Sequence, residues 1–74
     1  MIGRIVCSKA GSDKGEFSVI VKSDENAVFV SNGKRYKLSS PKKKNPKHLA
    51  LTNSTLKTEE FKTDKSLRKA LAIY

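Results

Sequence analysis

The sequence predicts a mainly β protein, a small all-β barrel or sandwich of about five strands followed by a short C-terminal helix. Three observations support this. Short runs of β-branched and aromatic residues are separated by turn signals at intervals of about 8 to 12 residues, the rhythm of a small barrel or sandwich. The pair Asn32-Gly33 is the strongest short hairpin signal, because both residues tolerate a positive φ angle. Residues 63–74 instead show helical periodicity.

Alternation of apolar and polar residues places the strands. The expected strands are residues 3–9, 17–23, 27–31, 34–38 and 48–53, with turns at 10–16 and 24–26. In the second strand, Phe17 is in phase with Val19 and Val21, which predicts that its ring lies in the core. In the fourth strand, Tyr36 is in phase with Leu38 and is expected in the core as well.

Phe29 differs from the other aromatic residues. It is out of phase with Val28 and Val30, so it lies on the face of its strand opposite to theirs. If that face is exposed, the ring is a candidate for stacking on a nucleobase. Strands of small barrels can bury both faces, so a core position for Phe29 remains an alternative.

The tail is expected to be organised differently from the strands. The predicted division is residues 1–53 as the barrel, 54–62 as a linker, and 63–74 as a helix packed on or beside the barrel. Thr63 is the expected N-cap of the helix. Leu67 and Leu71 fall on one side of it. Because Ser66 occupies the third helical position in place of Glu or Gln, no full capping box is expected.

The charge balance narrows the class of partner. Lys and Arg number 16 against 7 acids, a net charge of +9, which favours nucleic acid or an anionic membrane surface as the partner. No apolar run approaches the roughly 20 residues that a membrane span needs. The single cysteine excludes an internal disulfide and a multi-cysteine zinc site, and fits a reducing cytosol. We therefore expect a cytoplasmic protein with no membrane partner.

Catalytic chemistry finds little support in the sequence. The adjacent acids Asp24-Glu25 and Glu59-Glu60 point to opposite faces of an extended chain, so they do not converge on one substrate atom. His48 has no acid nearby in the sequence to orient it. The glycine spacing of residues 11–15 does not match a nucleotide-binding loop. We expect no enzymatic activity, cofactor, metal site or small-molecule substrate.

A basic segment is the main candidate for binding. Between Lys34 and His48 the sequence holds seven cations and no acid, and Pro41 and Pro46 restrict its backbone. A solvated surface without a task and a nuclear-import tag are the alternatives. Predicted strands on both sides favour an anchored, stiffened loop that binds phosphate. On this interpretation, Lys42–Lys44 can be replaced by Gln with little loss of stability.

A second candidate is the turn between the first two strands. Gly11 and Gly15 suit positive φ angles, so the segment can simply be a tight turn. The same geometry lets backbone amides approach a nucleic-acid backbone, with Lys14 beside them. The two interpretations are compatible.

The motifs together resemble a known family. The stretch "GRIVCSKAGSDKGEFSVIV" resembles a KOW motif, and it is followed in order by Asn32-Gly33, a Pro-Lys-Lys-Lys segment, "KHL…TN" and a C-terminal "RKAL". This set is similar to short bacterial KOW-domain RNA-binding proteins related to large-subunit ribosomal protein fourteen of the archaeal and eukaryotic type. The resemblance implies a KOW domain with an SH3-like barrel that contacts RNA through residues 9–14 and 35–48.

From charge and resemblance together we expect a non-catalytic RNA-binding protein, ribosomal or ribosome-associated, that contacts rRNA or ribosomal proteins within a ribonucleoprotein of the translation machinery. The expected RNA-binding residues are Lys9, Gly11, Lys14, Gly15, Lys34, Arg35, Lys37, Lys42, Lys43, Lys44, Lys47, His48, Arg68 and Lys69, with Phe29 as the candidate stacking residue. The alternatives are a protein-interaction SH3-like module of the transcription or translation machinery and a small basic DNA-binding protein.

Overall fold

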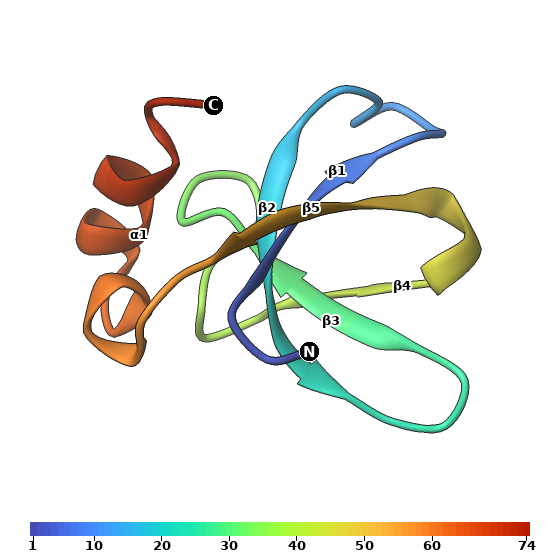
Figure 1. Cartoon of the computed structure of the whole chain (residues 1–74), viewed down its shortest axis with the longest axis horizontal. Coiled ribbons are helices and arrows are strands. Elements are labelled where there is room, and N and C mark those ends of the chain that lie inside the picture. The colour runs from blue at the N-terminus through green and yellow to red at the C-terminus, as the bar shows by residue number, and fades with distance from the viewer.

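The computed structural model, which describes residues 1–74, contains one five-stranded antiparallel sheet and one short α-helix (Figure 1). The strands are β1 (Arg4–Ser8), β2 (Phe17–Ser23), β3 (Val28–Ser31), β4 (Lys42–Lys44) and β5 (Leu49–Thr55). One-turn 3₁₀ helices, η1 (Pro46–His48) and η2 (Thr58–Phe61), flank β5, and α1 (Asp64–Leu71) ends the chain. The predicted mainly β fold with a C-terminal helix is confirmed.

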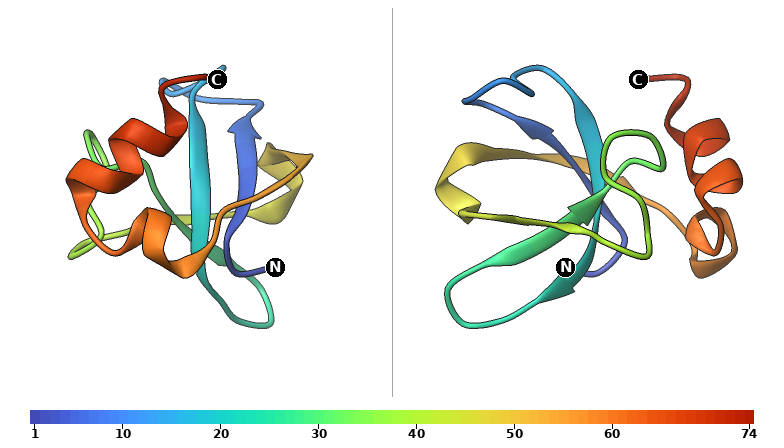
Figure 2. Two further views of the ribbon diagram at one scale, coloured as in Figure 1. Left: turned by 60° about the vertical axis from the view of Figure 1, so that its left-hand side comes forward. Right: turned by 180° about the vertical axis from the view of Figure 1, so that it is seen from behind.

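The strand order is β4-β3-β2-β1-β5. The first four strands form a meander, and β5 returns to pair antiparallel with β1. The sheet is strongly coiled, and η1 joins its two edge strands at the end of the molecule farthest from α1 (Figures 1 and 2). The turn between β1 and β2, which we call the first turn, therefore lies near η1, although the two segments are far apart in the sequence.

Two apolar clusters lie on opposite faces of the central strands. The strand cluster consists of Val6, Ile20, Val28, Val30 and Leu49. The helix cluster consists of Ile5, Val19, Leu67 and Leu71. Neighbouring residues of β1 and β2 enter different clusters, which explains why these strands are apolar on both faces. Burial of a Leu side chain stabilises by about 1.5–3 kcal/mol, so α1 is held by Leu67, which is fully buried, and Leu71.

The lysine run forms a strand, which corrects the prediction of a proline-stiffened loop. β4 pairs with β3, and Lys42, Lys43 and Lys44 lie opposite Val30, Phe29 and Val28 in the register. Residues 34–38, predicted as a strand, instead belong to the loop between β3 and β4.

The side chain of Asn32 explains why residues 34–38 form a loop and not a strand. Of the pair Asn32-Gly33, only Gly33 adopts a positive φ, 75°. The two-residue hairpin turn, which needs a positive φ at both residues, therefore does not form. The side-chain oxygen of Asn32 instead accepts hydrogen bonds from the amides of Lys34 and Tyr36, each at 3.0 Å. This side-chain turn widens the connection. As a result Tyr36 packs on the strand cluster and Leu38 on the helix cluster, whereas the sequence predicted one shared face.

The C-terminal part contains more regular secondary structure than the linker and helix that the sequence predicted. β5 extends to Thr55 and η2 follows, so structure fills much of the predicted linker. Thr63 caps α1 as predicted, since its hydroxyl accepts a hydrogen bond from the Ser66 amide at 3.0 Å. The expectation of no capping box is wrong, because the Ser66 hydroxyl accepts in return from the Thr63 amide at 3.3 Å. None of the helices has the length and apolar character needed to cross a bilayer.

Candidate nucleic-acid interface

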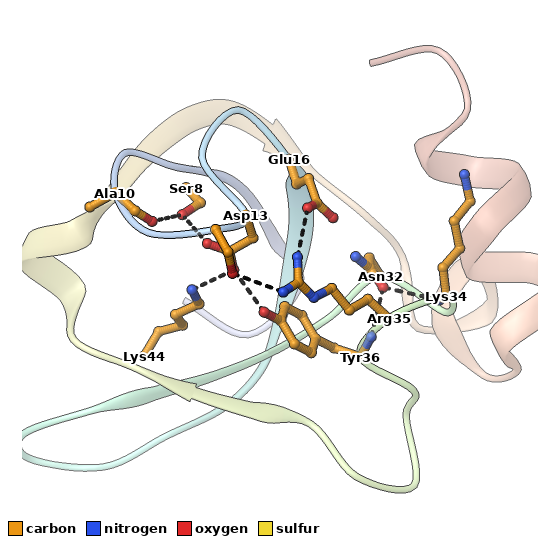
Figure 3. Close-up of polar contacts among 10 residues, drawn as sticks. Ser8, Ala10, Asp13, Glu16, Asn32, Lys34, Arg35, Tyr36 and Lys44 are labelled. Atoms are coloured by element: carbon orange, nitrogen blue, oxygen red, sulfur yellow. Dashed lines mark hydrogen bonds and ion pairs between the residues drawn. The ribbon is translucent and has the colours of Figure 1, made fainter.

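The turn between β1 and β2 is organised by a buried carboxylate, Asp13 (Figure 3). Its Oδ1 accepts a hydrogen bond from the Ser8 hydroxyl at 2.9 Å. Its Oδ2 accepts one from the Tyr36 hydroxyl at 2.9 Å and one from Lys44 Nζ at 2.5 Å. Asp13 thus joins β1, the β3–β4 loop and the end of β4 at one point.

The electrostatics of this cluster follow from its burial. The hydrogen bond from Lys44 lowers the pKa of Asp13 far below its ordinary value, and the Ser8 and Tyr36 hydroxyls act in the same direction against the effect of burial. Burial, followed by the neighbouring Asp13 carboxylate, raises the pKa of Tyr36. At neutral pH the cluster therefore contains an ionised Asp13, a protonated Tyr36 and a lysine.

Lys44 is consequently not available to RNA in the way that the sequence suggested. Its side chain is 14% exposed and its ammonium is paired with Asp13. In a strand, successive side chains point to opposite faces, so the three lysines of β4 cannot all face one ligand. The expectation that all three can be replaced without loss of stability is corrected, because loss of Lys44 leaves a buried carboxylate without its counter-ion.

Arg35 also has partners within the protein. Its guanidinium lies 3.3 Å from the Glu16 carboxylate (Figure 3) and donates a hydrogen bond to the Ser12 hydroxyl at 2.8 Å. The Arg35–Glu16 pair is about half exposed, so Arg35 still lies at the surface of this region. The pair holds the β3–β4 loop against the first turn.

The first turn and η1 lie side by side. The amide of Lys9 donates to the carbonyl oxygen of His48 at 2.8 Å, and Ser8 pairs with Leu49 in the β1–β5 register. Asn45 fixes the start of η1 by accepting a hydrogen bond from the Lys47 amide at 3.0 Å. Two basic segments far apart in the sequence are thereby brought together.

Five exposed basic residues result from this arrangement, and we call them the basic surface. They are Lys9, Lys14, Lys42, Lys47 and His48. Lys43 is exposed as well, but it lies opposite Phe29 on the other face of β4 and is not included. None of them takes part in either of the two ion pairs of the protein. Because β4 is an edge strand, its lysines also hinder pairing with another sheet, so their charge has a structural use as well.

The glycine turn is tight, as predicted. Gly11 and Gly15 have φ angles of 85° and 87°. The amides of Lys14 and Gly15 donate to Gly11 and Ser8 carbonyl oxygens, at 3.2 and 2.8 Å, so they are engaged within the protein. The Gly11 amide, which precedes them, makes no hydrogen bond within the protein and lies between the exposed residues Lys9 and Lys14.

The remaining predicted cations do not join the basic surface. Arg68, on α1, donates a hydrogen bond to the Gly33 carbonyl oxygen at 2.7 Å. Lys34 extends away from Asp13 beside α1 (Figure 3) and lines a cleft of about 200 Å³ with Arg68. Lys69 lies near the acids Glu59 and Glu60. Lys37 is exposed beside Leu38, whose amide is bonded to Asp64 at the start of α1. The segments that carry these residues, α1 and the start of the β3–β4 loop, lie on the helix side of the molecule, opposite η1 (Figure 2).

Asp13, the residue that arranges the site, was not identified from the sequence. The available signal was an acid between two glycines in a basic protein, but its partners Tyr36 and Lys44 lie 23 and 31 residues away. Phe29, the candidate stacking residue, is half-buried and belongs to neither apolar cluster.

Comparison with known proteins gives no assignment. No family model matches the chain, and no curated protein matches it significantly.

Proposed function

We propose that the protein is a non-catalytic, cytoplasmic RNA-binding protein of the ribosome or of a ribosome-associated complex. The basic surface neutralises phosphates of folded rRNA and so positions the protein on it. The sequence resemblance to KOW-domain ribosomal proteins supports the choice of RNA in the translation apparatus over other anions.

The observation that carries the proposal is the convergence of two basic segments. Lys9 and Lys14 come from the first turn, and Lys47 comes from η1; the Asp13–Lys44 pair and the Lys9–His48 hydrogen bond hold these segments together. Concentrating like charges costs self-repulsion, which an anionic partner removes. A rigid cationic surface also binds a polyanion with less ordering cost than a mobile tail.

Salt dependence of binding tests the electrostatic part. A structured rRNA fragment is titrated with the protein between about 50 and 200 mM salt, and four to six neutralised phosphates give a log–log slope of about −3 to −5. The variant K42Q/K47Q should lower the affinity and flatten the slope by about 1 to 2, because about two phosphate contacts are lost.

The matched control is K57Q/K62Q, which removes the same charge from exposed positions on the helix side. We expect it to bind like the wild type, and both variants to keep the wild-type melting temperature. A flat slope for the wild type, or equal losses in both variants, contradicts the proposal. Equal affinity for duplex DNA at the same salt favours a DNA-binding protein instead.

Ribosome association is tested separately. After sedimentation of a cell lysate through a sucrose gradient at low salt, the protein should migrate with ribosomal fractions and leave them at high salt or after nuclease treatment. Absence from those fractions contradicts the ribosomal part of the proposal. An interaction that survives nuclease favours a protein-binding module.

A further inference from the structure

A second feature lies on the outer face of the sheet, where one aromatic ring stands between two lysines. Phe29 of β3 is opposite Lys22 of β2 on one side and opposite Lys43 of β4 on the other. Residues opposite each other in neighbouring strands share a face and lie about 5 Å apart. The three side chains therefore form a row across three adjacent strands.

A bulge in β2 produces this row. The β2–β3 register shifts between Ile20 and Lys22, so that Val21 is the extra residue. Without the shift, Lys22 would share the face of Ile20, which is in the strand cluster. The bulge re-aims Lys22 onto the face of Phe29. Its Nζ lies 5.4 Å from the centre of the Phe29 ring.

The ring is placed to meet a ligand. Phe29 is half-buried and packs in neither apolar cluster, and the flexible side chain of Lys22 lies over its ring. Both Lys22 and Lys43 are exposed, and neither forms an ion pair. Asp24, the acid of the neighbouring turn, accepts hydrogen bonds from the amides of Asn26 and Ala27, at 3.0 and 2.8 Å. These bonds are the main cause that lowers the pKa of Asp24, and the charges of Lys43 and Lys22 nearby act in the same direction without forming an ion pair.

We propose that this row binds one unpaired nucleobase of single-stranded RNA, stacked on Phe29, with the phosphates on either side of that nucleotide contacting Lys22 and Lys43. The inference rests on the proposed RNA-binding function and adds the class of RNA. Stacking needs a base that is free of its duplex, because the bases of an A-form helix are stacked on each other. Lys22 moves from the ring to a phosphate when the base arrives.

The chemistry favours this occupant. An aromatic platform between cations matches a planar base between two phosphates. A cationic peptide is disfavoured by the two lysines, and the Asp and Glu side chains that would pair with the lysines in an acidic peptide carry no ring to stack on Phe29.

The test compares Phe29→Leu with Phe29→Tyr, which keeps the ring. Each protein is titrated with a single-stranded RNA of about ten nucleotides and with a duplex of the same length at one salt concentration. Loss of a stacked base should weaken single-strand binding of F29L by roughly 5- to 100-fold. F29Y should remain within about twofold of the wild type, and duplex binding should be unchanged in both variants.

A second variant keeps the test decisive if F29L folds poorly. K22Q/K43Q changes only exposed side chains and should flatten the salt slope for single-stranded RNA by about 1 to 2, with no change for the duplex. The matched control for charge is K57Q/K62Q.

The outcomes separate the two proposals. If the wild type binds RNA but F29L binds single strands equally well, or if K22Q/K43Q matches its control, the stacking site is refuted and the proposed function stands. If the wild type binds neither RNA, the proposed function fails, and the stacking site fails with it.

Discussion

Replacing Asp13 by Asn tests how the first turn is held in place. The substitution keeps the shape of the side chain but removes the charge that compensates Lys44, in a pair whose side chains are only 4% and 14% exposed. Breaking a buried ion pair from one side costs about 3–5 kcal/mol. We expect a loss near the lower end of that range, because Lys44 keeps some contact with water and the introduced amide can still accept a hydrogen bond.

That loss is large for this protein. At about 0.05–0.15 kcal/mol per residue, a chain of 74 residues has a free energy of unfolding of about 4–11 kcal/mol. A loss of about 3 kcal/mol corresponds to a fall in melting temperature of about 12–24 °C for a domain of this size. Urea denaturation at neutral pH measures the change directly.

Glu16→Gln is the matched control, because it breaks the other ion pair, whose side chains are 42% and 46% exposed. An exposed pair contributes about 0–1 kcal/mol, so the control should be nearly as stable as the wild type. The double variant D13N/K44M should lose less than the sum of the two single variants, since the partners are coupled. Equal losses in D13N and E16Q refute the assignment of Asp13 as the organising residue.

The pH dependence gives an independent check. The pKa of Asp13 is lowered in the folded protein, mainly by the hydrogen bond from Lys44. Its stabilising contribution is therefore complete well above the ordinary pKa of 3.8 and is lost as the pH falls below that value toward the folded pKa. The wild type should lose more stability than D13N on acidification below about pH 4. If the stability of the wild type and of D13N falls equally with decreasing pH, the assigned role of the Asp13 charge is wrong.

Two further substitutions test the helix side. Gly33→Ala introduces a Cβ that would lie 2.5 Å from the Asp64 carbonyl oxygen, at a φ of 75°. It should therefore lose clearly more stability than Gly15→Ala, where φ is 87° but no atom lies within 4 Å and the backbone strain alone costs about 1–2 kcal/mol. Equal losses of unfolding free energy in urea denaturation would show that α1 packs loosely on Gly33. Thr63→Ala removes the N-cap of α1 and should cost about 1 kcal/mol, whereas Thr58→Ala, which removes no cap, should be nearly neutral in the same assay.

Local patterns predicted most of the elements. β2 was placed at its observed bounds, because its residues alternate strictly and turns flank it. The Thr63 cap was predicted because capping is decided by a few neighbouring residues. The strand expected at residues 34–38 was wrong because the Asn32 side chain bonds its own backbone, a choice that alternation does not report.

The site was predicted less completely than the fold. Net charge and the positions of the glycines are properties of the sequence, and they indicated the basic segment and the first turn. Which lysines remain available depends on partners distant in the chain. Lys44 was assigned to RNA because its neighbours are lysines, but the structure pairs it with Asp13, 31 residues earlier.

For this protein, the sequence by itself determined the mainly β class, the capped helix and the net positive charge, because these depend on short-range pattern and on composition. Only the tertiary structure decided that the lysine run is an edge strand, that Asp13 withdraws Lys44 from the surface, and that Lys22 and Lys43 flank Phe29. The physical reason is that strand register and buried ion pairs join residues far apart in the chain, and their partners are selected only when the sheet forms.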